Sequence, residues 1–280
     1  MKKISRRSFL AAAGLSVAAL ALTACGGSSA STASSVASSA AASSEAASTS
    51  AAAGELTTVE AGKLTMATNA TFPPYEMTTD AGDIEGIDVE TAQAIADKLG
   101  LELQIDDMDF DAALLSVQQG KADIVMAGVT VTDERKAVMD FSDSYATGIQ
   151  SIIVPEGSDI ASPDDLAGKK IGTQRGTTGY IYCSDDFGDD AVVAYDSGLT
   201  AVQALNNGQV DAVVIDNAPA KEYVAANPGL AILDTSYAEE DYAIGMAKGS
   251  SLEAAVNAAL EELKADGTLQ AIVDKYITAE

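Results

Sequence analysis

The chain has 280 residues, with 42 Asp and Glu against 16 Lys and Arg, and its formal net charge is −26. So acidic a chain is a poor partner for nucleic acid. The chain contains no histidine, which excludes imidazole catalysis and metal sites built from His. We therefore expect no metal, no cofactor and no nucleic-acid partner.

Residues 1–24 have the pattern of a signal peptide. Four basic residues precede the apolar run AAAGLSVAALAL, which is too short to remain in a membrane as a spanning helix. The stretch SRRSFL resembles a twin-arginine signal, but paired arginines also occur in general export signals, so both routes stay open. Removing Lys2, Lys3, Arg6 and Arg7 takes the net charge from −26 to −30.

The sequence LTAC at 22–25, followed by Gly26, resembles the lipobox of bacterial lipoproteins. The resemblance implies that Cys25 is lipidated and anchors the protein on the extracytoplasmic face of the cell membrane. A soluble secreted protein cut nearby is the alternative. Residues 25–58 are almost entirely Ser, Ala, Thr and Gly, which cannot form a core and indicate a flexible tether. An Ala-rich helix is less compatible with the Ser and Thr content.

From Leu64 onwards, short apolar strands alternate with helical patterns, which is typical of βαβ units. The first set is predicted as a strand at 63–68, a helix at 89–99, a strand at 101–105, a helix at 109–119 and a strand at 122–128. The second set begins after the apolar stretch at 149–155 and is predicted as a short helix at 162–168, a strand at 170–174, a turn and helix from 175–179 and a strand at 191–196. Two further helices are predicted at 251–267 and 268–277.

An internal similarity links the two sets. Residues 113–128 and 201–216 align without a gap, each as a helix, a glycine stop, one polar residue and a strand. This similarity predicts two related α/β lobes, although chance recurrence of the pattern is the alternative. We predict that residues 59–148 and 241–280 form lobe 1 and residues 149–240 form lobe 2. Each lobe would be a largely parallel sheet flanked by helices, and the two chain crossings would form a hinge.

The strands of the internal similarity end at Gly128 and Asp216. In open parallel sheets, ligands bind beyond the carboxyl ends of the strands, so a site is expected there. Arg135 lies shortly after the first strand end, in a chain with few cations. Either it pairs with a neighbouring carboxylate (Asp133, Glu134 or Asp140), which would contribute little to stability, or its partner is a ligand.

Six motifs together resemble the extracellular solute-binding proteins of amino-acid ABC transporters, over about 64–277. They are TNATFPPYE, GIDVETAQAIADKLG, DFDAALLSVQQGKADIVMAGVTVTDERKAVMDFSDSY, GTQRGTTG, VDAVVIDN and LEELKADGTLQAIVDKY. The resemblance implies a periplasmic-binding-protein-like fold, in which two lobes close over one amino acid. It also implies a monomer that is not an enzyme and that delivers its amino acid to the membrane permease of an ABC importer.

The resemblance also implies roles for residues of the site. Arg135 would take the α-carboxylate of the ligand, Thr130 would contact the amino-acid backbone, and Asp216 would pair with the α-amino group. The turn at 176–178 would offer backbone N–H groups to the same carboxylate. The complete predicted set is Asn69, Phe72, Phe110, Gly128, Thr130, Arg135, Gln174, Thr177, Thr178 and Asp216.

The nature of the ligand side chain depends on Asn69, Phe72 and Phe110, which match positions around that side chain. Several family members have Asp at the position of Asn69, so a strictly cationic ligand is in doubt. An amide both donates and accepts hydrogen bonds. We expect a polar uncharged or basic L-amino acid, with glutamine-like and arginine-like ligands ahead of acidic or branched aliphatic ones. Gln174 and Arg175 would rim the cleft, unless Arg175 is a solvated surface charge.

Two other classes of function stay open: a dehydratase-like secreted enzyme that uses Asp or Glu, and a ligand-sensing module on the same fold. The sequence has no G-x-S-x-G, P-loop or G-x-G-x-x-G motif. The alternating acids at 107–111 resemble a calcium loop, but Ala112 and Gln118 stand where Gly and Glu are needed. Cys183 is expected to be a small buried hydrophobe rather than a reactive thiol, with no disulfide partner.

Overall fold

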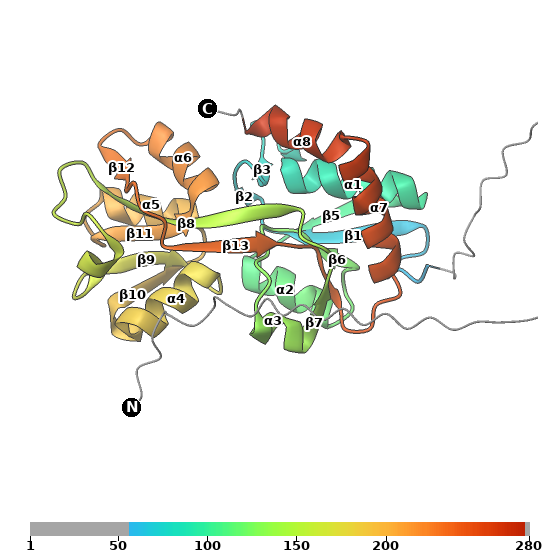
Figure 1. Cartoon of the computed structure of the whole chain (residues 1–280), viewed down its shortest axis with the longest axis horizontal. Coiled ribbons are helices and arrows are strands. Elements are labelled where there is room, and N and C mark those ends of the chain that lie inside the picture. Colours follow the sequence, from blue (N-terminus) through green and yellow to red (C-terminus); the bar gives the residue numbers. More distant parts are fainter. Residues whose placement is uncertain (1–55, 278–280) are drawn as a thin grey trace, which may run out of the picture. The chain divides into compact units, whose positions relative to one another are not determined.

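The computed structural model describes residues 56–277. The predicted signal peptide, Cys25 and nearly all of the predicted tether lie outside the described residues. Within 56–277 the chain forms two larger sheets, each flanked by helices, and a small three-stranded sheet (Figure 1). Among the helices in this described range, none is both long enough and apolar enough to cross a membrane.

The first sheet has the strand order β5-β1-β6-β14-β7. Its strands are β1 (Lys63–Thr68), β5 (Glu102–Asp107), β6 (Ile124–Val125), β7 (Met139–Phe141) and β14 (Gly245–Ala247). The helices beside it are α1 (Ile87–Leu99), α2 (Phe110–Gln118), α3 (Asp133–Val138), α7 (Glu253–Ala265) and α8 (Thr268–Tyr276). Alternate residues of β1 face opposite layers, because Leu64 and Met66 pack with α1 and α7 whereas Ala67 packs with α2.

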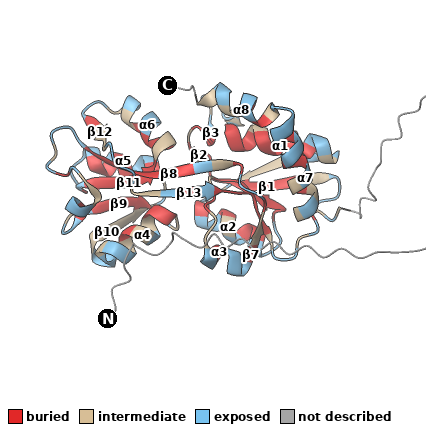
Figure 2. Ribbon diagram, in the orientation of Figure 1, coloured by how far each residue is buried: buried red, intermediate tan, exposed pale blue. Residues whose placement is uncertain are grey.

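The second sheet has the order β10-β9-β11-β8-β12, and β13 also pairs with β8. Its strands are β8 (Ala146–Pro155), β9 (Ile171–Gln174), β10 (Val192–Tyr195), β11 (Ala212–Asp216), β12 (Leu230–Ile232) and β13 (Ala238–Tyr242). The helices beside it are α4 (Thr178–Phe187), α5 (Gly198–Asn206) and α6 (Asn217–Ala226), with 3-10 turns η1 (Pro163–Leu166) and η2 (Asp189–Ala191). The central strands β1, β9 and β11 and the inward helix faces are buried, whereas the edge strands β5 and β10 are only partly buried (Figure 2).

The prediction of largely parallel sheets is only half right, because both sheets are mixed. Strands β1, β5 and β6 are parallel, as are β9, β10 and β11. Strand β14 runs antiparallel to β6 and β7, and β8 runs antiparallel to β11, β12 and β13. Parallel pairs need a helical crossover, whereas a chain that leaves along β8 and returns along β13 gives antiparallel neighbours.

The internal similarity of the sequence is confirmed as a structural repeat. Gly120 and Gly208 both have φ of 66° and both follow the end of a helix, α2 or α5. Asp123 and Asp211, at equivalent positions, each accept a hydrogen bond of 2.7 Å from a backbone N–H, of Thr65 and of Lys170 respectively. Each acid therefore fastens the start of a repeat strand to the adjacent strand.

Strands β8 and β13 form an antiparallel pair that extends between the two sheets (Figure 1). Their register places Ala146 opposite Tyr242, and the backbone of Tyr242 also forms a bridge with Thr130. The fully buried ring of Tyr242 packs against Gly148, where a Cβ would come within 2.5 Å of the ring. Any side chain at residue 148 would therefore displace Tyr242 and disturb the crossing.

Cys183 lies on α4 among the apolar residues of the second sheet and is fully buried. Burial raises the pKa of its thiol to about 12, so the thiolate form is disfavoured. The prediction of a buried, hydrophobic cysteine is confirmed.

Candidate ligand-binding cleft

A single cavity brings together all ten predicted site residues. It holds about 320 Å³ of unfilled space, part of which is open to solvent. Sequence reasoning missed two further lining residues, Glu76 and Ala127. Most lining residues lie at or after the carboxyl ends of β1, β6, β9 and β11 or at the start of α2 and α4, where the parallel strands were expected to place a site. Phe72 and Glu76 come from the small sheet and Arg135 from α3.

Arg135 is the only buried Lys or Arg between residues 56 and 277, with 8% of its surface exposed. The short helix α3 holds its backbone, because the side chain of the N-cap Thr132 accepts a hydrogen bond from the Arg135 N–H. Its guanidinium donates to the carbonyl of Thr130 at 2.8 Å and to the carbonyl of Gly176 at 3.1 Å. The guanidinium carbon lies 5.4 Å from the centre of the Phe110 ring.

The interpretation of Arg135 as part of a surface ion pair is wrong. Asp140 pairs instead with Lys248, at 2.6 Å, and Asp133 and Glu134 are exposed. None of the ion pairs found within the described residues includes Arg135. Burial lowers the pKa of its guanidinium, but nearby Glu240 opposes this effect, and an arginine stays charged in proteins.

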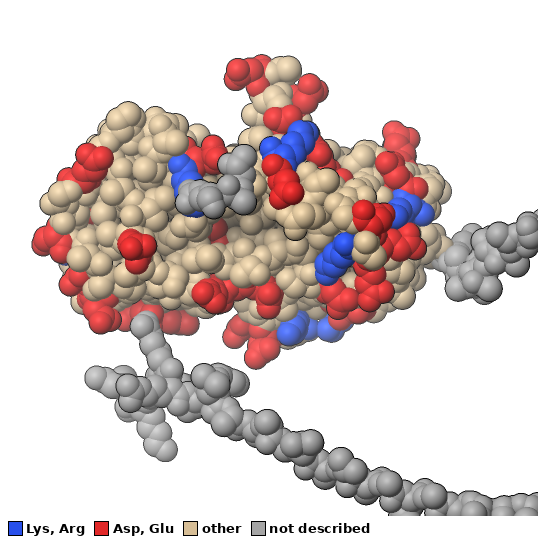
Figure 3. Space-filling model, turned by 45° about the horizontal axis from the view of Figure 1, so that its top comes forward, with Lys and Arg blue, Asp and Glu red and all other residues tan. Residues whose placement is uncertain are grey.

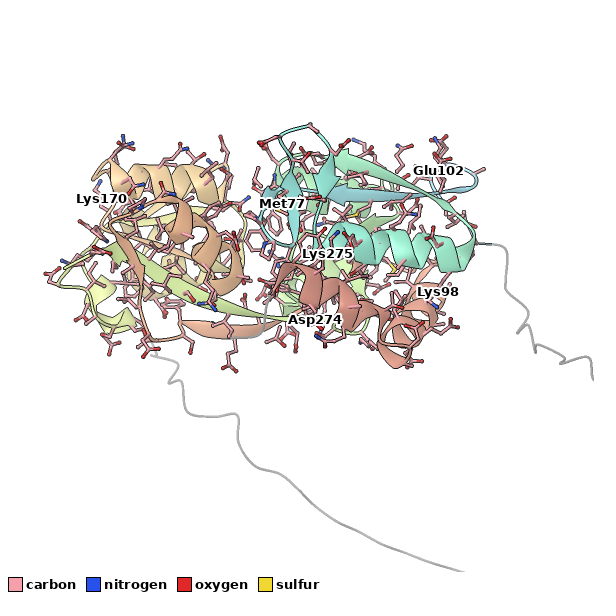
Figure 4. The ribbon with its side chains drawn as sticks, turned by 90° about the horizontal axis from the view of Figure 1, so that it is seen from above. Met77, Lys98, Glu102, Lys170, Asp274 and Lys275 are labelled. Atoms are coloured by element: carbon pink, nitrogen blue, oxygen red, sulfur yellow. The ribbon has the colours of Figure 1, made fainter. Side chains whose placement is uncertain are left out.

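The lysines labelled in Figure 4, which are Lys98, Lys170 and Lys275, lie on the surface. Lys275 of α8, for example, pairs with Glu90 of α1 (Figure 4). Asp and Glu outnumber Lys and Arg on the face that Figure 3 shows. Against this acidic surface, a cation buried inside the molecule with only neutral acceptors on its guanidinium indicates an anion-binding role.

Asp216 ends β11 and lies in the same cavity, with 8% of its surface exposed. Its carboxylate accepts a hydrogen bond from the Gln150 amide at 2.7 Å and another from the Tyr242 hydroxyl. Burial raises the pKa of Asp216 from 3.8 to about 7. Because its hydrogen-bond donors are neutral, the carboxylate is set up to receive an ammonium group.

Residues around the expected ligand side chain already contact one another. Asn69 donates to the Met108 carbonyl at 2.9 Å, and its oxygen accepts from Gln174 at 2.9 Å and from Thr71 at 2.9 Å. In this conformation its amide therefore joins the first sheet to β9. Phe72 and Phe110 both line the cavity: the Phe110 ring faces the Arg135 guanidinium, and Phe72 stacks on Tyr75 at 5.9 Å.

Arg175 does not line this cavity. Its side chain is 57% exposed and lies 3.8 Å from Asp196, in a separate surface pocket beside α2. The alternative that Arg175 is a solvated charge is therefore correct, and the cavity has one arginine.

Glu76 is an acid of the cavity that sequence reasoning did not single out. It lies on the small sheet, whose strands are β2 (Thr71–Phe72), β3 (Glu76–Thr78) and β4 (Ile84–Glu85). Its side chain is fully buried, and apart from the carboxyl group of Asp88 no group of the described residues hydrogen-bonds to either of its oxygens. Burial first, and then the nearby Asp88, raise the pKa of Glu76 well above its ordinary value. The position ends the motif TNATFPPYE, but a motif alone does not tell an inward acid from an outward one.

A buried guanidinium on α3, beside the first sheet, and a buried carboxylate at the end of β11 in the second sheet line one cleft, an arrangement suited to the two ends of a zwitterion. Together with two sheets joined by crossing strands, they define a solute-binding protein of the periplasmic-binding type. Residues 64–279 match the bacterial extracellular solute-binding proteins, family 3, and the chain belongs to this family.

Similar proteins include the L-cystine-binding protein TcyJ of Escherichia coli, which is 34% identical over 79% of this chain and 85% of its own length. The solved arginine-, lysine-, histidine-binding protein ArtJ of Geobacillus stearothermophilus is 35% identical, with a TM-score of 0.75 over 78% of this chain and 96% of its own. An ancestral arginine-binding protein, solved bound to glutamine, is 42% identical, with a TM-score of 0.74 over 78% of this chain and 99% of its own.

Proposed function

We propose that the protein captures a basic or polar L-amino acid outside the membrane and delivers it to the permease of an ABC importer. The observation that carries the proposal is the placement of Arg135 and Asp216 in one cleft. Arg135 would hold the α-carboxylate with two parallel donors, and Asp216 would hold the α-amino group. Closure of the predicted lobes, 59–148 with 241–280 over 149–240, would enclose the ligand in a monomer.

The ligands for which the three similar proteins are named, or with which they were solved, support an amino acid, since arginine, lysine, histidine, glutamine and cystine all carry both α-groups. None of these proteins is named as an enzyme. A screen for turnover of the bound amino acid would test the dehydratase-like alternative directly.

Glu76 favours a basic side chain on the ligand. A fully buried carboxylate whose hydrogen-bond partner is another acid, Asp88, is costly when ionised, and a ligand cation in the cavity would offset that cost. Arg135 is engaged elsewhere, so an acidic ligand side chain would meet Glu76 without a free cation. We therefore place arginine and lysine first, glutamine next, and glutamate, aspartate and leucine last.

A thermal-shift screen of the mature domain against the twenty amino acids tests this order, because ligand at 100 times its Kd stabilises by about 2.7 kcal/mol. Glu76→Gln should weaken arginine binding by about tenfold or more and glutamine binding by less than about threefold, measured by calorimetry. Glu85→Gln, an exposed acid on the neighbouring strand, is the control and should change neither. A preference for glutamate or leucine by more than about tenfold would show that the pocket is misassigned.

We also propose that Cys25 carries a lipid anchor, that residues 1–24 are the export signal, and that residues 25–58 are the tether. Each buried methylene contributes about 0.8 kcal/mol, so two or more acyl chains hold a protein firmly on a membrane. Cys25→Ser should move the protein from the membrane fraction to the soluble fraction. Cys183→Ala removes the other cysteine and should leave the protein on the membrane; a Cys25→Ser protein that stays there contradicts the lipobox.

A further inference from the structure

Glu240 lies beside the cleft without lining the main cavity, on the crossing strand β13. It is 7% exposed, and one carboxylate oxygen, Oε2, accepts three hydrogen bonds. The donors are the Thr130 hydroxyl at 3.1 Å, the Thr178 hydroxyl at 3.0 Å and the Gln150 amide at 3.0 Å. Thr130 follows β6 of the first sheet, whereas Thr178 begins α4 beside the second sheet.

These hydrogen bonds decide what the two hydroxyls can offer a ligand. A hydroxyl has one hydrogen and two lone pairs, and both Thr130 and Thr178 direct that hydrogen at Glu240. Their oxygens therefore face the cavity as acceptors. They can accept hydrogen bonds from an ammonium group but cannot donate to a carboxylate, which leaves the α-carboxylate to Arg135 and backbone N–H groups.

The same network connects Glu240 to Asp216. The Gln150 amide nitrogen donates to Asp216 at 2.7 Å as well as to Glu240, so one side chain holds both carboxylates in place. Burial lowers the pKa of Arg135 and raises that of Asp216; the negative charge of Glu240 opposes the first shift and adds to the second. The end of the cleft that holds Asp216 and the two hydroxyls is therefore negative and rich in acceptors.

We propose that Glu240 is a positioning residue, which turns the Thr130 and Thr178 hydroxyls into acceptors for the α-ammonium of the ligand and joins the two lobes when the cleft is closed. The proposal rests on the proposed function, because it assigns a role towards a bound amino acid. Glu240 itself would not touch the ligand. Its effect would pass through the two threonines.

The first test is calorimetry on Glu240→Gln with L-arginine, or with L-glutamine if that is the tighter ligand. Glutamine at this position keeps the size of the side chain but removes its negative charge, and its amide oxygen is a weaker acceptor for the three donors than a carboxylate oxygen. Affinity should fall by about tenfold or more. Glu239→Gln, the exposed neighbour on β13, is the matched control and should bind like the wild type.

Two further measurements separate positioning from a merely structural role. In a Thr130→Val, Thr178→Val background, Glu240→Gln should change affinity by less than about threefold, because the groups through which it acts are gone. Loss of the α-amino group from the ligand, in the desamino analogue, should cost the wild type more affinity than it costs Glu240→Gln. If Glu240→Gln does not fold, Thr178→Val alone should show part of the loss of affinity and part of the smaller cost of removing the α-amino group.

Three results would each overturn the proposal. They are wild-type affinity in Glu240→Gln, an equal loss of affinity in the valine background, and an unchanged ratio between the affinities for the amino acid and for its desamino analogue. In those cases the wild type still binds its amino acid, and the proposed function stands. If the wild type binds none of the twenty amino acids, the proposed function fails, and the role of Glu240 fails with it.

Discussion

Arg135→Ala is expected to abolish amino-acid binding while the protein stays folded. The guanidinium is buried in the cleft and has neutral acceptors only, so its charge is available to the α-carboxylate of a ligand. Truncating one partner of such a buried, hydrogen-bonded charge pair costs about 2–5 kcal/mol, or roughly 30- to several-thousand-fold in affinity. Calorimetry with the best ligand of the wild type measures the loss, and thermal unfolding checks the fold.

Arg175→Ala is the control for this variant. It removes an arginine that is 57% exposed and lies outside the cavity, so its affinity should match that of the wild type. Near-normal binding by Arg135→Ala would mean that the α-carboxylate is held elsewhere, with the backbone N–H groups at the start of α4 as the remaining candidates.

Ligand affinity is expected to fall as the pH falls below 7. The pKa of Asp216 is about 7 in the ligand-free protein, chiefly because the group is buried. An ammonium group requires the ionised carboxylate, so a protonated Asp216 must lose its proton before it can bind. For one such proton, affinity drops by about tenfold per pH unit below the pKa, so binding at pH 5 should be about 100-fold weaker than at pH 8.

The stability of the ligand-free fold depends on the protonation of Asp216 with the opposite sign. The pKa of Asp216 is higher in the folded ligand-free protein than in the unfolded chain, so its contribution to stability is fully present below pH 3.8 and is lost as the pH rises through about 7. Calorimetry from pH 5 to pH 8 tests the affinity. Asp216→Asn should bind the amino acid weakly, with an affinity that changes less with pH than that of the wild type. Asp190→Asn, at an exposed position, should keep the pH dependence of the wild type. A wild-type affinity that does not change with pH would contradict the role of Asp216.

The internal repeat was readable in the sequence because it is local. A glycine stop, one polar residue and an Asp at the start of a strand fall within a dozen residues, and Gly120 and Gly208 adopt the same φ. Gly128, Arg135 and Asp216 could be predicted for a related reason, because they lie at or shortly after strand ends that parallel sheets bring together. The other cavity residues were predicted from the resemblance of their motifs to the family.

The Glu240 network could not be predicted in this way. Glu239, Glu240 and Asp241 are three acids in a row, which as a pattern indicates a solvated strand edge. Only the pairing of β13 with β8 turns Glu240 inward and Glu239 outward. Its donors are 62, 90 and 110 residues away in the sequence, and no local rule connects residues at such separations. The antiparallel β14 was missed for the same reason, since its partners β6 and β7 lie far earlier in the chain.

The position of β14 has a consequence for the order in which the molecule is completed. This strand is inserted between β6 and β7 in the first sheet, yet it comes after every strand of the second sheet in the chain. A chain emerging from its N-terminus can finish the second sheet while the first still has a gap between two strands. Distant pairings of this kind form late, because the loop must close before they contribute. We therefore expect the half of the cleft that carries Arg135 to be completed last, when residues near the C-terminus fill that gap.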